Sequence, residues 1–131
     1  GQMDVLQQHV DLRRGIHDFY TDTLSDISGV SVQQNPSSDF NSNFWLSTII
    51  IDPATGKDPE SLRLFMAEKG VETRRLWRPM HMQPVYADAP YYGSNCCERL
   101  FERGLCLPSG SSLSDNELKY VSDCIHHFFR Q

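Results

Sequence analysis

The chain has 131 residues, of which 39% are hydrophobic and 22% are charged, and its formal net charge is -5. This length supports one domain with a real hydrophobic core and is too short for two ordinary domains. The composition excludes a disordered chain, and the negative charge argues against a nucleic-acid-binding protein.

Residues 2–25 have the pattern of a long amphipathic helix. Its apolar residues cover roughly 200° of the helix, which is wide enough to need packing partners on two sides. No Ser, Thr, Asp or Asn precedes the pattern as an N-cap. We therefore interpret residues 1–28 as an interdomain linking helix that is truncated at its start; the alternative is a complete small protein. His9 and His17 lie on the apolar face, which predicts that both are buried or pack at an interface.

Short strands and a polar loop are expected next. Residues 30–33 predict a strand after Gly29, and residues 35–42 predict a loop rich in Asn, Ser and Asp. The segment FWLSTIII, residues 44–51, is the strongest strand signal in the chain. Because it is hydrophobic almost throughout, we expect a central strand that is covered on both faces.

The second half of the chain contains three further predicted helices. Asp58 caps the first one, which ends at Gly70, and residues 71–76 predict a strand. The second begins at Ser94, with Cys97, Leu100 and Phe101 at core spacing, and residues 105–107 predict a strand after it. The last begins with a capping box at residues 114–117 and buries Leu118, Val121, Ile125 and Phe128. This alternation predicts an α+β, two-layer domain over residues 29–131, with helices packed on a small sheet.

The four cysteines, at positions 96, 97, 106 and 124, lack the CxxC pairs of a zinc site. We expect reduced and mostly buried thiols, with a disulfide or a metal site as the alternatives. No apolar run is long enough to span a membrane, and no signal-peptide pattern is present. These features predict a cytoplasmic protein without a membrane or metal partner.

The stretch from Thr73 to Gly93 predicts a shaped loop that belongs to a site. Its prolines exclude a regular helix or a central strand, and ordering so irregular a loop costs entropy that packing alone seldom offsets. His81 could act as an acid, a base or an anion ligand; the alternative is a loop histidine bonded to the backbone. In a strand, Arg74 and Arg75 point to opposite faces, and either could bind an anion or lie in solvent. No GxSxG, P-loop or GxGxxG motif occurs, so the residues alone indicate the ligand-binding portion of an α+β protein.

Several segments form an ordered series over nearly the whole chain: GQMDVLQQHVDLRRGIHDFY, NFWLSTIIIDP, VETRRLWRPMHMQPVY, PYYG and ERLFERGLCLPSGSSLSDNELKYV. This series resembles the C-terminal region of the DegT/DnrJ/StrS family, which are pyridoxal-phosphate-dependent aminotransferases acting on nucleotide-linked keto sugars. Arg75 departs from the family pattern, which often has proline at that position.

The resemblance implies the C-terminal small domain of a fold-type I aminotransferase, with an upstream domain that holds pyridoxal 5'-phosphate. No lysine here lies in a plausible pocket, so the cofactor lysine is expected upstream and the chain alone should not transaminate. The resemblance implies substrate contacts from Arg74, His81, Gln83 and Tyr86, and no catalytic, cofactor or metal residue in this chain. It further implies a homodimer that uses a keto-sugar nucleotide and an amino-acid donor, for which glutamate is expected. The alternatives are a non-catalytic regulatory or sensory member of the family and a stand-alone interaction module.

Overall fold

The computed structural model describes residues 1–131, in which short strands alternate with helices. The order is α1 (Leu6–Thr23), β1 (Val30–Val32), β2 (Thr48–Ile51), α2 (Pro59–Glu68), β3 (Arg74–Arg75), α3 (Cys96–Arg103), β4 (Gly104–Cys106) and α4 (Asp115–Phe129). Four 3-10 turns occur in addition, at Gln2–Val5, Pro53–Thr55, Met80–Met82 and Pro84–Tyr86. None of the helices combines the length and the hydropathy that crossing a bilayer requires.

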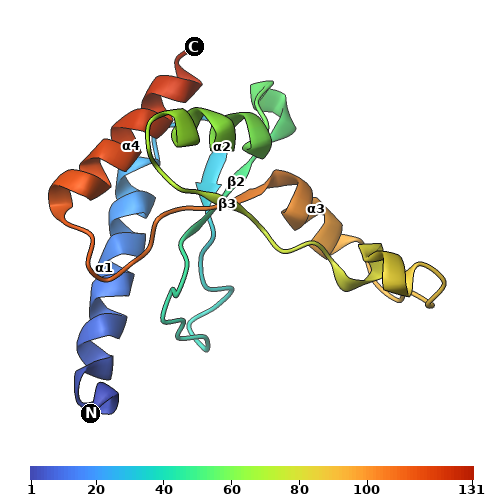
Figure 1. Ribbon diagram of the computed structural model, residues 1–131, viewed down its shortest axis with the longest axis horizontal. Coiled ribbons are helices and arrows are strands. Elements are labelled where there is room, and N and C mark those ends of the chain that lie inside the picture. Colours follow the sequence, from blue (N-terminus) through green and yellow to red (C-terminus); the bar gives the residue numbers. More distant parts are fainter.

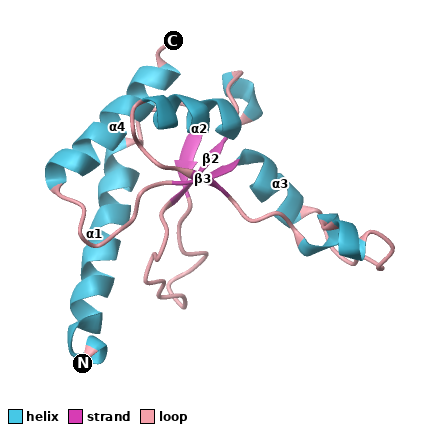
Figure 2. Cartoon of the chain, viewed as in Figure 1, coloured by secondary structure: helices cyan, strands magenta, loops and turns pink.

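The strands form one antiparallel sheet in the order β1-β2-β4-β3. Helices α1, α2 and α4 gather around this sheet, whereas α3 leads away from it (Figure 1). Figure 2 shows the strands meeting at the centre, between the helices. The predicted α+β class, with helices packed on a small sheet, is confirmed.

One hydrophobic core joins the sheet to three helices. Strands β2 and β4 contribute Ile49 and Leu105, which lie opposite each other in the antiparallel register and are both fully buried. Fifteen buried residues form the core: Ile16, Tyr20, Leu24, Ile49, Ile51, Leu62, Met66, Val71, Leu105, Leu107, Leu118, Val121, Cys124, Ile125 and Phe128. The buried faces predicted for α2 and α4 are therefore largely confirmed; Phe65 packs against the core but is only partly buried.

Local capping fixes the start of α2 and of α4, as the sequence predicts. The Asp58 carboxylate accepts hydrogen bonds from the backbone N–H groups of Glu60 and Ser61, at 2.9 and 3.0 Å. Ser114 and Glu117 form the predicted capping box of α4. Each cap satisfies N–H groups that have no partner within the helix.

Helix α1 joins the core only through its C-terminal half. Ile16, His17 and Tyr20 are its buried residues, and the Tyr20 hydroxyl donates to the Pro108 carbonyl at 2.8 Å. The packing role predicted for His17 is therefore confirmed. His9 is exposed and its ring nitrogen Nδ1 lies 2.8 Å from the Ser111 hydroxyl, so it is not buried within this chain, and interface packing stays a prediction.

Strand β2 is shorter than its composition predicts. It begins at Thr48, because Phe44 adopts a left-handed conformation with φ of 44° and its ring stacks on buried His17, with centroids 3.6 Å apart. A left-handed residue cannot continue a strand. Strand β3 is likewise only Arg74 and Arg75 and forms the edge of the sheet.

The burial predicted for α3 is wrong. This helix has no buried residue, and Cys97 on its supposed core face is exposed. The reason is that α3 leads away from the sheet and the other helices instead of packing along them (Figure 1). All four cysteines are free, but only Cys106 and Cys124 are buried, so the prediction of mostly buried thiols holds for half of them.

The structure leaves no space for a side chain at Gly104, where α3 passes into β4. A Cβ atom there would overlap the Leu76 side chain and lie 2.6 Å from the Leu100 carbonyl oxygen. We expect Gly104→Ala to lower the free energy of unfolding by about 1–3 kcal/mol, as overpacking does. Gly15→Ala is the matched control, since Gly15 is exposed in α1 with open space around it, and it should stabilise by about 0.5–1 kcal/mol. Urea denaturation measures both, and equal stability of the two variants would contradict the packing described.

Candidate functional site

The two arginines of β3 are separated by the alternation of side chains along the strand. Arg74 is paired with Cys106 of β4, and Arg75 with Leu105. Leu105 belongs to the core, so Cys106 and Arg74 lie on the other face of the sheet. The predicted division of the two arginines between opposite faces is therefore confirmed.

Arg75 fixes the end of α3 to the sheet. Its Nη2 atom donates to the carbonyl oxygens of Phe101 and Glu102, at 2.6 and 3.2 Å. The guanidinium group also lies over the Phe101 ring, 5.2 Å from its centroid. A positive group at a helix C-terminus is stabilised by the carbonyls that have no partner there. Arg75 therefore has a structural role.

Arg74 lines a cavity of about 350 Å³ at the sheet edge, which we call the Arg74 pocket. Three segments that are distant in the sequence build it: the residues before β2, the β3 segment and the turn after β4. Its lining residues are Trp45, Leu46, Glu72, Thr73, Arg74, Arg75, Trp77, Cys106, Leu107, Pro108 and Ser109.

The polar groups of the Arg74 pocket differ in whether they have hydrogen-bond partners. The exposed Arg74 guanidinium donates from Nε and Nη2 to one oxygen of Glu72, at 2.9 and 2.7 Å. Thr73 is buried, and its hydroxyl has no hydrogen-bond partner. The Ser109 hydroxyl accepts from the Ser47 N–H and donates to the Leu107 carbonyl, both at 2.8 Å, which fixes the turn after β4. The pocket thus offers a cationic group and a free hydroxyl on a rigid floor.

Burial raises the pKa of the Cys106 thiol above its ordinary value of 9.0. A raised pKa keeps the sulfur protonated near neutrality, and a protonated thiol is a poor nucleophile. Cys106 therefore contributes to the wall of the Arg74 pocket by packing and not by chemistry.

His81 holds together the projecting part of the chain, residues 78–103, which we call the arm. Its Nε2 atom lies 2.6 Å from the Glu98 carboxylate of α3, and its ring stacks on Tyr91 with centroids 3.8 Å apart. The alternative stated for this histidine was a hydrogen bond to the backbone; the partner here is a carboxylate. The arm is thus organised by its own side chains, outside the hydrophobic core.

The four residues predicted to contact substrate do not share one cavity. His81 and Tyr86 line a cavity of about 470 Å³ in the arm, together with Met80, Ala89, Pro90 and Tyr91. Arg74 lies in its own pocket, and the Gln83 amide makes only a long 3.5 Å contact with the Arg78 carbonyl. Trp45, Thr73 and Glu98 were missed by sequence reasoning, because their neighbours come from distant segments. No cluster of three or more His, Cys, Asp or Glu side chains is placed to hold a metal ion.

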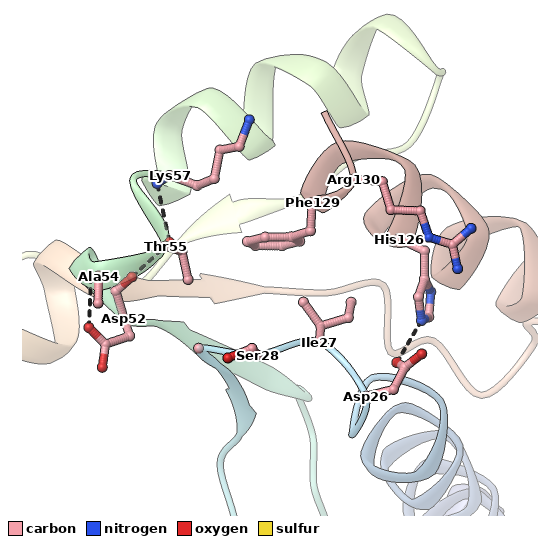
Figure 3. A pocket seen from close by; sticks show the side chains of 11 residues that line it. Asp26, Ile27, Ser28, Asp52, Ala54, Thr55, Lys57, His126, Phe129 and Arg130 are labelled. Carbon is pink, nitrogen blue, oxygen red and sulfur yellow. Dashed lines mark hydrogen bonds and ion pairs between the residues drawn. The ribbon is translucent and has the colours of Figure 1, made fainter.

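A further cavity of about 550 Å³ lies between the end of α4 and the turns before β1 and after β2 (Figure 3). Asp26 and His126 meet at one side of it, and Lys57 and Arg130 also line it. The His126 Nε2 atom donates to the Asp26 carboxylate at 2.9 Å, and Nδ1 donates to the Ser122 carbonyl at 2.8 Å. None of the predicted site residues lies in this cavity.

Comparison with known proteins shows one family. Residues 1–126 match the DegT/DnrJ/EryC1/StrS aminotransferase family. EpsN of Bacillus subtilis (strain 168), named as a pyridoxal phosphate-dependent aminotransferase, is 36% identical over 98% of this chain and 33% of its own length. GDP-perosamine synthase of Escherichia coli O157:H7 is 29% identical over 98% of this chain and 34% of its own. The chain thus spans about one third of these relatives.

Solved structures share the fold. DesI, crystallised in the presence of its TDP-sugar product, superimposes with a TM-score of 0.87 and 27% identity, covering 98% of this chain and 33% of DesI. The aminotransferase TlmJ from Streptoalloteichus hindustanus gives a TM-score of 0.82 at 24% identity, over 96% of this chain and 33% of TlmJ.

The Asp26–His126 pair predicts a stability that depends on pH. Desolvation acts to lower the pKa of His126, but the bonds to Asp26 and to the Ser122 carbonyl outweigh it and raise that pKa above its ordinary 6.5. The hydrogen bond with His126 lowers the pKa of Asp26 below its ordinary 3.8. The histidine contribution is complete below pH 6.5 and is lost as the pH rises through the raised pKa. The aspartate contribution is complete above pH 3.8 and is lost as the pH falls through the lowered pKa.

The measurement is the Tm of the wild type and of Asp26→Asn at about pH 5.5 and about pH 9. At the lower pH, we expect the Tm of the wild type to be higher than that of Asp26→Asn. At the higher pH, this difference in Tm between the two proteins should disappear. His127→Gln, which changes the exposed neighbour of His126 on α4, should keep the wild-type dependence. A difference between Asp26→Asn and wild type that stays constant over this range would contradict the pairing.

Proposed function

Because the chain belongs to the DegT/DnrJ/EryC1/StrS aminotransferase family, we propose that it forms the C-terminal part of a pyridoxal-phosphate-dependent sugar aminotransferase. Residues 29–131 are the small domain, and residues 1–28 are the helix that links it to the cofactor-binding domain. The whole protein moves an amino group from an amino acid, glutamate, to a keto-sugar nucleotide. The observation that carries this proposal is the family match over residues 1–126.

The residues of this chain do not fit covalent attachment of pyridoxal phosphate. That attachment needs a lysine in the site, and no lysine lines the Arg74 pocket. Lys57 and Lys69 lie over the rings of Phe128 and Phe65, 5.0 and 5.4 Å from the centroids, and Lys119 is exposed on α4. We therefore place the cofactor and its lysine in the part of the protein outside this chain, and we derive no step through the cofactor here.

Arg74 is the residue that we assign to an anionic group of the donor or of the sugar nucleotide. Its present partner, Glu72, is exposed, and an exposed ion pair contributes only about 0–1 kcal/mol to stability. A carboxylate or phosphate that enters the pocket can replace Glu72 and accept two parallel hydrogen bonds from the guanidinium group. The arrangement supports binding and orientation of substrate and supplies no nucleophile.

We assign His81, Gln83 and Tyr86 to contacts with the sugar nucleotide. His81 and Tyr86 line one cavity of the arm, and the bond to Glu98 holds His81 in place. A histidine that donates to a carboxylate from one ring nitrogen presents the other nitrogen in a defined orientation. This residue therefore orients a substrate oxygen at a fixed position.

The exposed apolar residues of the first helical segment support partners for α1. The exposed fractions of Met3, Val5, Leu6 and Leu12 are 77, 42, 49 and 44%, respectively. Several exposed apolar side chains near one end of a helix indicate an interaction surface. We assign this surface to the upstream domain and to a homodimer, in the cytoplasm, where the four free cysteines stay reduced.

The histidine of the arm gives the first test of the proposal. In the full-length enzyme, His81→Ala should lower kcat/KM for the sugar nucleotide about tenfold or more, which corresponds to about 1.4 kcal/mol, and should leave cofactor loading unchanged. His127→Ala, which removes an exposed histidine of α4, is the control and should behave as wild type. Steady-state kinetics that do not distinguish the two variants would remove His81 from the site.

The lysines give the second test. Mixing this chain with pyridoxal phosphate should yield no saturable, protein-bound cofactor absorbance, because none of its lysines lies in the candidate site. The counter-result is specific: a one-to-one adduct that disappears when Lys57, Lys69 or Lys119 is changed to Ala would show that the chain carries a cofactor site of its own.

A further inference from the structure

The two tryptophans of the chain lie side by side in the lining of the Arg74 pocket. Trp45 and Trp77 are its only tryptophans, and both line the pocket. Their ring centroids are 6.1 Å apart, with planes inclined by 35°. The two side chains are 59% and 64% exposed, although tryptophan is largely buried in most folded proteins. Two neighbouring exposed indoles indicate a surface that a ligand covers.

Trp45 is held in this position by α1, through a strained backbone. Phe44 before it has φ of 44°, which a bulky side chain rarely adopts, and its ring is stacked on buried His17. Nη1 of Arg13 donates to the Trp45 carbonyl at 2.6 Å. The backbone N–H of Trp45 donates to the Asn43 side-chain oxygen Oδ1 at 3.0 Å. Strain that is maintained by surrounding contacts is typical of ligand-binding segments.

Two polar groups beside the indoles define what the ligand must carry. The Arg74 guanidinium can bind an anion, because its present partner Glu72 is exposed and is readily replaced. The Thr73 hydroxyl, in a side chain only 7% exposed, lines the same pocket without a hydrogen-bond partner. A buried hydroxyl without a partner is unfavourable until a ligand atom satisfies it. The pocket therefore combines flat aromatic surface, positive charge and a free hydroxyl.

We infer that Trp45 and Trp77 form a stacking platform for the base of the nucleoside diphosphate portion of the substrate, with a phosphate on Arg74. This inference rests on the proposed function and names the part of the substrate that the Arg74 pocket takes. Bases stack on aromatic side chains with little dependence on sequence, and arginine binds phosphate through two hydrogen bonds. Glutamate lacks a ring, and a sugar phosphate lacks a flat π face, so each satisfies only part of the pocket.

Intrinsic fluorescence of this chain tests the inference directly, because every tryptophan signal comes from the pocket. Uridine, guanosine or thymidine diphosphate should quench the emission saturably, and titration calorimetry should give the same Kd. Trp45→Leu and Trp77→Leu should each raise that Kd about tenfold, with the remaining tryptophan as the reporter. Arg74→Gln should remove the preference for the diphosphate over the uncharged nucleoside. Phe40→Ala is the matched control, since Phe40 is an exposed aromatic residue of the same loop outside the pocket, and its Kd should not change.

Three results would overturn the inference: no saturable binding by either method, equal binding of glucose 1-phosphate or glutamate, and binding of pyridoxal phosphate alone. Far-ultraviolet circular dichroism of each variant confirms that it is folded. The inference and the proposed function fail separately. If the activity of the full-length enzyme depends on His81 while this chain binds no nucleotide, only the stacking platform is contradicted. If this chain binds nucleotide but the full-length protein transfers no amino group to a keto-sugar nucleotide, only the proposed function is contradicted.

Discussion

The structure depends on the pairing of β4 with a strand on each side. Its residue Leu105 is fully buried in the core, while the next residue, Cys106, is paired with Thr48 of β2 and Arg74 of β3. The three residues of β4, Gly104–Cys106, therefore fix both the core and the floor of the Arg74 pocket. Because side chains alternate along a strand, a slip by one residue would turn Arg74 toward the core and Arg75 toward the pocket. The register of one short strand thus decides which guanidinium group is exposed and which is bonded to the end of α3.

Helix α1 connects this core to the loop that precedes β2. Its C-terminal half contributes Tyr20 to the core, and Arg13 and Arg14 bind the loop at the Trp45 carbonyl and at the Asn41 side chain. Ordering a long loop without regular structure costs conformational entropy. The contacts with Arg13 and Arg14 offset part of this cost, although the loop is not part of the sheet. The helix that we assign to the domain linkage is therefore also the element that positions Trp45.

Local signals in the sequence predict the starts of α2 and α4, because a cap and its helix are neighbours in the chain. Asp58 and the capping box at Ser114 are examples. Long-range contacts decide the features that sequence reasoning missed. Phe44 has the composition of a strand residue, but it adopts a left-handed conformation, stacks on His17 and lies outside strand β2, which follows it. Because side chains alternate along a strand, the sequence predicts that Arg74 and Arg75 point to opposite faces. No sequence periodicity predicts that Trp45 lies beside Trp77.

The two candidate cavities have a common structural origin in β3. Arg74 lines one of them, and its neighbour Arg75 binds the carbonyls at the end of α3, the helix that carries Glu98 and so holds His81 of the other cavity. A sugar nucleotide has a base, a diphosphate and a sugar, and it is larger than a cavity of about 350 Å³ accommodates in full. A ligand divided between the two cavities would therefore be positioned by one short edge strand. Because side chains alternate along β3, Arg74 stays exposed in the Arg74 pocket while Arg75 binds the end of α3.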